Sequence, residues 1–381
     1  SRYEFANIHT TDFELFTSHN SFTDDTICTI AIADALKAQC PSAEILFVGA
    51  QDRMEMQRVP EAGYEVVGLP IVGMPRRKNP IRLLRFLLRW MQCNRQAKRI
   101  IRKFGPDAII GVGGYASVPV MQMGQRLGVP TFIQEQNGYA GVANRLLSRR
   151  AQSIFVAYPG MERFFPADRI QLLGNPVRGL LQLSLPPQAE ARAEMQIPSQ
   201  GQLVLIMGGS LGAATLNAAV LNHLDELAAM PNVTILLQTG ASHYAAAQEA
   251  AMRHPVDNLR VVDFIARMDL AYAAADIIVS RAGAISISEL CIVGKPLVLV
   301  PSPNVAEDHQ TKNAQVLASR GAAMLLPDAR AESDLLPTIQ RLAEDASRME
   351  SQREQLKKLA LPNASHDIAA AILSSITPAG K

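Results

Sequence analysis

The residues of this chain whose types and spacing best suit chemistry lie together at positions 280–289. They follow a β-branched run at positions 276–279, which predicts a short buried strand. Gly283 allows a tight turn, and Ser286 or Ser288 could cap or line the first turn of a helix after it. Backbone N–H groups would then point beyond the carboxyl end of the strand. Free donors and the helix dipole favour a phosphate there.

Glu289 adds a second kind of chemistry to this stretch. It would lie one turn into the helix, where a carboxylate repels phosphate but can accept two hydrogen bonds from the vicinal hydroxyls of a ribose. The stretch therefore indicates a nucleoside-diphosphate site. The alternative is an ordinary connection between a strand and a helix, with a capping serine and a surface glutamate, and this stretch alone favours neither.

Length and composition restrict the class of protein. The 381 residues suggest two domains, and 48% hydrophobic with 19% charged residues is typical of globular chains. No apolar run reaches the length of about 18 residues that a membrane span needs, and the first residues lack a signal-peptide pattern. The four cysteines form no CxxC pair, which argues against a zinc site or a disulfide framework and for reduced thiols in a cytosol.

Two glycine-rich turns follow predicted strands, one in each half of the chain. They stand at positions 111–119 and 208–213. A further predicted strand at 131–134 ends in polar residues at 135–138, and ligands bind at such carboxyl ends of parallel strands. Positions 183–198, rich in proline, alanine and glutamine, predict a connection between two domains.

This alternation predicts three parts of the chain. We expect an N-terminal domain at 1–177, which would dock on the membrane and hold an acceptor, and a C-terminal nucleotide-binding domain at 178–358. The final part, at 359–381, would be a helix that packs back on the N-terminal domain.

The most unevenly charged segment lies at positions 76–99, with nine basic residues and no acid. On a helical wheel Arg82, Arg85 and Arg89 share one face, and an apolar face includes Phe86 and Trp90. Such a helix suits an anionic bilayer surface, where each basic side chain contributes about 1 kcal/mol. The alternatives are a helix packed on a sheet with a solvated arginine face, and a nucleic-acid surface, for which the segment lacks a known pattern.

Six short motifs occur in an order and spacing that resemble the MurG family, the N-acetylglucosaminyltransferases that make lipid II from lipid I. The resemblance runs from about Ile30 to the end of the chain. The motifs stand at positions 111–115, 135–138, 174–178, 208–213, 280–284 with Glu289, and 308–314.

The resemblance implies an α/β fold of two Rossmann-like doubly wound domains facing a cleft, the GT-B type. It implies inverting transfer of N-acetylglucosamine from UDP-N-acetylglucosamine to the muramyl 4-hydroxyl of lipid I, a muramyl pentapeptide on undecaprenyl diphosphate. The enzyme would be peripheral, at the cytoplasmic face of the bacterial inner membrane, on an anionic membrane surface and without nucleic acid. No cofactor is expected, and since no Asp-x-Asp-like motif stands at the matching place, helix dipoles would replace a metal.

The family motifs assign expected roles to single residues. Glu289 would hold the ribose hydroxyls, the backbone around Ile265 would pair with uracil, and Gln310 would contact sugar hydroxyls. Arg178 and Asn137 would act across the cleft. The residues expected around the diphosphate are Ser210, Ala284, Ile285, Ser286, Ile287 and Ser288. Those expected on the acceptor side are Gly113, Gly114, Tyr115 and Glu135.

The chain departs from the family at its front. The family has a Gly-Gly-Thr-Gly-Gly-His loop that holds the acceptor diphosphate, but positions 20–25 here contain no glycine and no histidine. Two carboxylates stand there, which would repel a diphosphate. Asp25 occupies the slot of the family histidine, so the catalytic base is unassigned. Two alternatives stand beside the transferase. One is another enzyme on the same architecture, a UDP-N-acetylglucosamine 2-epimerase. The other is a non-catalytic scaffold that binds nucleotide or membrane, which the missing front loop favours.

Overall fold

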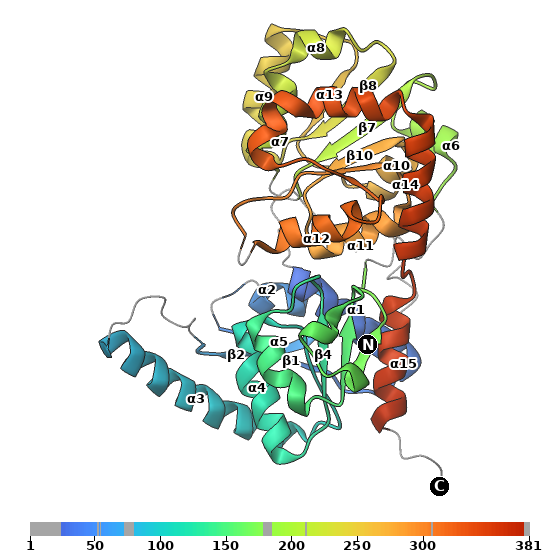
Figure 1. Ribbon diagram of the computed structural model, residues 1–381. Coiled ribbons are helices and arrows are strands. Elements are labelled where there is room, and N and C mark those ends of the chain that lie inside the picture. Colours follow the sequence, from blue (N-terminus) through green and yellow to red (C-terminus); the bar gives the residue numbers. More distant parts are fainter. Residues whose placement is uncertain are drawn as a thin grey trace, which may run out of the picture.

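The computed structural model describes residues 24–51, 53, 55–71, 80–177, 185–209, 212–305 and 308–376; for residues 24, 25 and 80–83 it describes the backbone alone. Two α/β domains lie one above the other in Figure 1, each built from parallel strands and helices. The Asp25 side chain, Arg178 and Ser210 fall outside the described part, as does the Arg82 side chain.

The N-terminal domain contains two separate parallel sheets. One pairs β1 with β2, and the other has the order β3-β4-β5-β6. Every residue of β4 and β5 is buried, as expected for parallel strands covered on both faces. The elements are α1 (Asp24–Gln39), β1 (Leu46–Ala50), α2 (Glu55–Glu61), β2 (Glu65–Leu69), α3 (Pro80–Phe104), β3 (Ile109–Gly111), α4 (Gly114–Leu127), β4 (Thr131–Glu135), α5 (Val142–Leu147), η2 (Ser148–Arg150), β5 (Ser153–Val156), η3 (Met161–Arg163), η4 (Ala167–Arg169) and β6 (Ile170–Leu172).

The C-terminal domain has one six-stranded parallel sheet, in the order β12-β11-β10-β7-β8-β9. The chain order reverses between β7 and β10, which is the switch point where open α/β sheets bind ligands. The elements are α6 (Gln188–Glu194), β7 (Gln202–Met207), α7 (Ala214–Leu221), α8 (Leu224–Ala228), β8 (Val233–Gln238), α9 (Ala241–Arg253), β9 (Leu259–Val262), α10 (Met268–Ala274), β10 (Ile277–Ser280), α11 (Ala284–Val293), β11 (Leu297–Leu299), α12 (His309–Ala318), β12 (Met324–Leu325), η7 (Asp328–Arg330), α13 (Ala331–Ala343) and α14 (Ala346–Leu359).

Strand β7 shows why this sheet is covered on both faces. Leu203 and Leu205 belong to a core that includes residues of α10, α11 and α14, whereas Val204 and Ile206 belong to a second core with residues of α7 and α13. The strand is apolar throughout because both faces are buried. The predicted connection at 183–198 needs a correction, since it contains helix α6, held to the domain core by Ala191.

Helix α15 (Ala364–Ile376) ends the described chain on the other domain. Its Ile368 and Ile372 are buried with Ile32 of α1 and with Phe132 and Phe155 of the N-terminal sheet. In Figure 1, α14 runs along the C-terminal domain and α15 runs along the N-terminal one. The end of the chain therefore connects the two domains a second time.

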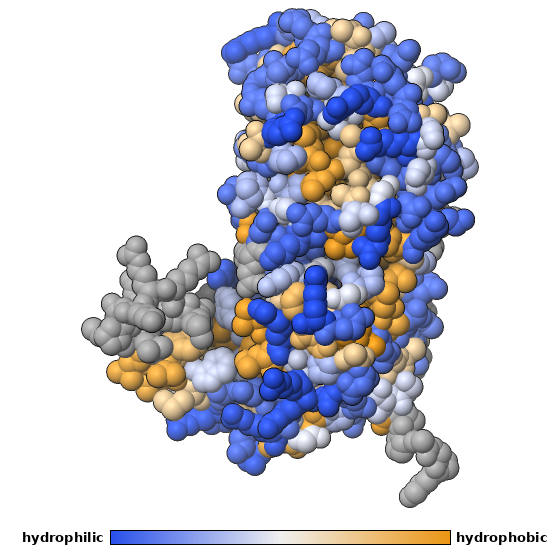
Figure 2. Space-filling model, in the orientation of Figure 1, coloured by the Kyte–Doolittle hydropathy of each residue, from blue (hydrophilic) through white to orange (hydrophobic). Residues whose placement is uncertain are grey.

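Helix α3 projects from the N-terminal domain (Figure 1). Cys93, Ala97 and Ile101 in its second half are buried, but Leu84 is 59% and Leu88 is 54% exposed. Figure 2 shows the outer part of this helix as an apolar surface. No helix in the described part of the chain is long and apolar enough to cross a bilayer.

Candidate active site

The stretch at 280–289 forms the predicted strand, turn and helix. Ser280 ends β10, and α11 begins at Ala284 with Gly283 as its N-cap. Two details of the prediction were wrong. Gly283 has φ −61° and ψ 146°, a conformation open to any residue, and no side chain among the described residues caps α11. The hydroxyl of Ser288 instead donates to the carbonyl of Ala284 at 3.1 Å.

Glu289 is buried, so the surface-glutamate alternative is wrong. It is 3% exposed, and the Tyr272 hydroxyl donates to its Oε2 at 3.4 Å. Burying a carboxylate costs free energy unless polar groups surround it. The structure therefore places a buried acid on the helix after β10, beside the switch point of the sheet.

The turn before α11 is held by two side chains. Gln310 Oε1 accepts from the N–H groups of Ala282, at 3.1 Å, and Ser302, at 2.8 Å. Arg281 donates to the carbonyl of Val300 at 3.0 Å and to Asp328 at 2.5 Å. The Gln310 oxygen and the Arg281 guanidinium are thus already used to fix the turn.

The glycine-rich turn after β7 packs too closely for side chains. Gly212 has φ +76°, and a Cβ there would lie 1.8 Å from the carbonyl oxygen of Thr239. A Cβ on Gly208 would lie 2.3 Å from the backbone nitrogen of Ala213. Glycine is required at Gly212 because the backbone after β8 passes directly against it. Glycine is required at Gly208 because the turn folds back and brings the backbone of Gly212 and Ala213 against it.

Ile265 lies in the loop that follows β9 and is 7% exposed. Within the described residues, neither its N–H nor its C=O bonds to another backbone group. The preceding turn is fixed by Asp263, whose carboxylate accepts from the Phe264 N–H at 2.7 Å. The Ile265 backbone can therefore pair with a flat polar edge such as a base.

Glu135 organises the loop at the carboxyl end of β4. Its carboxylate accepts from the N–H groups of Asn137, at 3.1 Å, and Gly141, at 3.0 Å, and from Asn144 Nδ2 at 2.9 Å. Burial raises the pKa of Glu135, and these three donors oppose that rise. The side chain is 3% exposed, so it shapes the loop from within.

The other residues predicted for the acceptor side lie at the start of α4. Gly113 and Gly114 have φ +104° and +69°, which explains the glycines. Tyr115 is 41% exposed, and its hydroxyl accepts from Arg53 at 3.1 Å. These residues and Glu135 follow the adjacent strands β3 and β4, as the sequence predicts.

The two domains meet through buried amides. Asn137 Oδ1 accepts from Asn313 Nδ2 at 3.1 Å, and Asn313 Oδ1 accepts from the Gly138 N–H at 2.9 Å. Asn175 Nδ2 donates to Ser288 Oγ at 3.0 Å. The structure therefore brings Asn137 to the domain junction, and its role toward the substrates stays a prediction. Sequence reasoning missed Asn175 and Asn313, although both stand inside the motifs.

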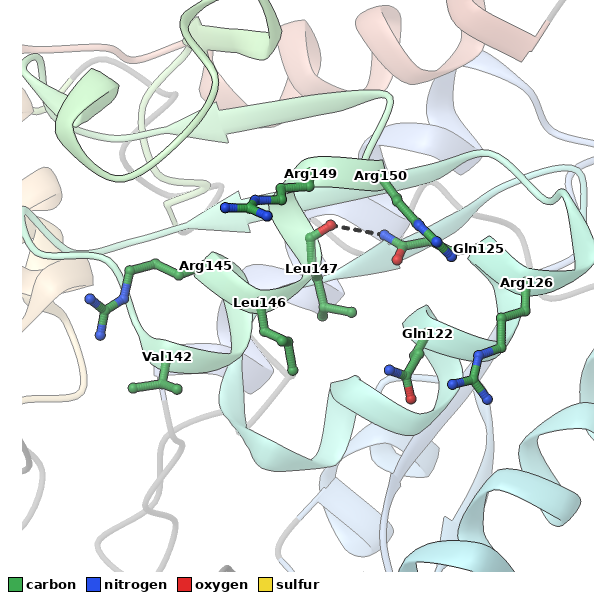
Figure 3. Close-up of a pocket in the computed structure, with 9 residues that line it drawn as sticks. All are labelled: Gln122, Gln125, Arg126, Val142, Arg145, Leu146, Leu147, Arg149 and Arg150. Atoms are coloured by element: carbon green, nitrogen blue, oxygen red, sulfur yellow. Dashed lines mark hydrogen bonds between the residues drawn. The ribbon is translucent and has the colours of Figure 1, made fainter.

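A cavity of about 670 Å³ is lined by residues of α4, α5 and η2. Figure 3 shows Arg145 at one end and Arg126 at the other, with Leu146 between them. Arg149 and Arg150 complete a basic lining. This surface was not predicted from the sequence, because its arginines come from separate elements.

Comparison with known proteins identifies the class of enzyme. Residues 25–156 match the glycosyltransferase family 28 N-terminal domain, and residues 203–368 match the family 28 C-terminal domain. A crystal structure of Acinetobacter baumannii MurG superposes with a TM-score of 0.75 at 27% identity, covering 92% of this chain and 96% of that one. The GT-B architecture predicted from the sequence is confirmed.

The curated relatives define the family more closely. An enzyme of Porphyromonas gingivalis is 49% identical over 89% of both chains, and one of Bacteroides fragilis is 46% identical over 90% of both. Each is named UDP-N-acetylglucosamine–N-acetylmuramyl-(pentapeptide) pyrophosphoryl-undecaprenol N-acetylglucosamine transferase. This chain belongs to that family. A UDP-N-acetylglucosamine 2-epimerase of Neisseria meningitidis shares the fold alone, at 14% identity and a TM-score of 0.63.

Proposed function

We propose that this chain transfers N-acetylglucosamine from UDP-N-acetylglucosamine to the muramyl 4-hydroxyl of lipid I, with inversion. One observation carries the proposal. The buried Glu289 stands at the switch point of the C-terminal sheet, next to a helix N-terminus that abuts the loop organised by Glu135. A nucleotide site and an acceptor-side loop are thereby adjacent across the domain junction.

The donor would bind along the carboxyl edge of the C-terminal sheet. Glu289 would hold the ribose, the Ile265 backbone would pair with uracil, and the N–H groups at the start of α11 would face the diphosphate. The dipole of α11 stabilises the charge that develops on the leaving UDP. The Gln310 oxygen accepts two backbone hydrogen bonds, so its Nε2 is the part that would contact a sugar hydroxyl.

Direct displacement also requires a base for the acceptor proton. Asp25 remains the predicted occupant of that position, and its side chain lies outside the described residues. Arg178 and Ser210 remain predictions for the same reason. We also propose the domain boundaries at 177/178 and 358/359, which lie near the ends of β6 at Leu172 and α14 at Leu359.

The membrane surface would be bound by α3. Leu84, Leu87 and Leu88 are exposed on its outer half, together with Arg85 and Arg89. Phe86 and Trp90, predicted to share the apolar face, stack with ring centroids 6.0 Å apart and are only half-buried. A helix with exposed leucines and arginines binds an anionic interface through both apolar and charged contacts.

A transfer assay tests the proposed activity. Purified chain, radiolabelled UDP-N-acetylglucosamine and a lipid I analogue should give a labelled disaccharide lipid. Formation of UDP-N-acetylmannosamine without acceptor would instead support an epimerase. Binding of UDP without either product would support the scaffold, and both results would contradict the proposal.

A further inference from the structure

One buried amide touches both sides of the domain junction. Asn175 is 1% exposed and lies between β6 and the start of the C-terminal domain. Its Nδ2 donates to the Gln136 carbonyl at 3.0 Å in the loop after β4. The same nitrogen donates to Ser288 Oγ at 3.0 Å and approaches the Ala284 carbonyl at 3.4 Å, both in the first turns of α11.

The orientation of this amide is fixed by its neighbours. Gln134 Nε2 donates to Asn175 Oδ1 at 3.1 Å and to the Gly174 carbonyl at 3.0 Å. Exchanging the oxygen and nitrogen of Asn175 would bring two donors together on one side and oxygen against two carbonyls on the other. Pro176 further restricts the Asn175 backbone to extended conformations.

Ser288, which the sequence predicts at the diphosphate, makes two hydrogen bonds through its hydroxyl in this structure. Its hydroxyl hydrogen is donated to the Ala284 carbonyl, and its oxygen accepts from Asn175. The Ser288 hydroxyl therefore faces the N-terminal domain, while the backbone N–H groups at the start of α11 remain for the diphosphate.

We infer that Asn175 is a positioning residue that sets the distance between the donor site on α11 and the loop at Gln136. The inference rests on the proposed function. Asn175 is 1% exposed, so it acts through the carbonyl of Gln136 and the hydroxyl of Ser288. Displacement requires the reacting atoms to be held about 3–3.5 Å apart, and a misplacement of about 1 Å can cost about 100-fold in rate.

The second amide contact makes the inference testable without separating the domains. Asn313 still bonds to Asn137 and Gly138 when Asn175 is changed. Loss of Asn175 should therefore alter the angle between the domains rather than release them. The donor site itself, centred on Glu289, stays intact.

The test uses Asn175→Ala, Ser288→Ala and the double variant of the full chain. Asn258→Ala is the matched control, because Asn258 Nδ2 donates to three carbonyls, those of Leu227, Met230 and Val233, inside one domain. We expect Asn175→Ala to lower kcat for transfer by about tenfold or more while the Kd for UDP stays within about twofold. The double variant should be no worse than Asn175→Ala, because the two groups share one hydrogen bond.

The control variant and a second measurement show whether Asn175 positions the two domains or only stabilises the fold. Asn258→Ala should lower Tm and leave kcat unchanged. Small-angle scattering needs no turnover and should show a changed interdomain distance for Asn175→Ala only. An unchanged scattering profile, or a kcat that falls no more than in Asn258→Ala, would overturn the inference. Absence of transfer by the unaltered chain would overturn the proposed function instead, and the scattering result would still test Asn175.

Discussion

The two domains differ in how their strands are arranged: the C-terminal domain has one sheet, and the N-terminal domain has two. The C-terminal sheet has six continuous parallel strands with a switch point between β7 and β10. The N-terminal domain has strands in two sheets, of two and four strands. Each βαβ unit of the C-terminal sheet is complete within residues 202–325, whereas α1 opens the described chain without a preceding strand. The donor half of the described chain is therefore built from consecutive strand–helix units, whereas the acceptor half combines two sheets with the distant helix α15.

The largest expected effect is at the glycine turn of the donor half. Gly212→Ala places a Cβ 1.8 Å from the Thr239 carbonyl at φ +76°, so we expect a loss of about 4 kcal/mol or more in the free energy of unfolding. Gly209→Ala is the control, since φ is +86° but nothing lies within 4 Å of the added Cβ. It should cost about 1–2 kcal/mol. Equal losses in urea denaturation would contradict the close approach at Gly212.

The next effect tests whether the acceptor half depends on the end of the chain. Ile368 of α15 is fully buried against the N-terminal sheet. Ile368→Ala should lower the free energy of unfolding by about 2–5 kcal/mol. Hydrogen exchange should show the loss in β4 and β5. A loss confined to strands of the C-terminal sheet would contradict the packing.

Substitutions on the exposed face of α3 should change the stability of the protein little but should strongly weaken its binding to membranes. Glutamate at both Leu84 and Leu88 should reduce flotation with anionic vesicles by about tenfold or more, because two apolar contacts become charged. Tm should stay the same, since both leucines are exposed. Met252 is 71% exposed on α9 of the other domain, so Met252→Glu should leave flotation unchanged. Equal loss in both variants would remove α3 as the docking element.

The smallest effect is a pH dependence in the acceptor half. Burial raises the pKa of Glu135 above its ordinary value of 4.5. The folded state then binds more protons than the unfolded state as the pH rises from about 4.5 towards the raised pKa, so stability falls across that window. Glu135→Gln should remove this dependence of stability on pH. The glutamine N–H₂ group would face the N–H donors that now bond to the carboxylate, so the variant should also disturb the loop. A slope that persists in urea titrations of the variant would assign it to another group.

Much of the donor site could be predicted from the sequence because its signals are local. The β-branched run before Ser280 and the acid at Glu289 indicated the strand, the helix and the site. The reason given for Gly283 was wrong, because spacing does not reveal φ. Ser288 was expected at the diphosphate, but its partner Asn175 lies 113 positions away, and no periodicity reports such a contact.

The acceptor half was less predictable for physical reasons. Exposed leucines on α3 could be inferred from the mixture of arginine and apolar residues, but Leu84 and Leu88 were not singled out. Their exposure depends on α3 projecting from the domain. The basic cavity at Arg126 and Arg145 arises only when α4 packs on α5, so the sequence gives no sign of it.

Calorimetry with UDP tests the difference between the two domains most directly. Glu289→Gln keeps the volume of the buried side chain but replaces the carboxylate with a neutral amide. The amide has only one oxygen to accept hydrogen bonds from the two ribose hydroxyls. A hydrogen bond to a charged group contributes about 1.5–3 kcal/mol, and that contribution would be lost. We predict that Glu289→Gln weakens UDP binding by about tenfold or more, whereas Glu135→Gln in the acceptor half leaves it unchanged. Unchanged UDP affinity in Glu289→Gln, or an equal loss in Glu135→Gln, would contradict a nucleotide site at the switch point of the C-terminal sheet.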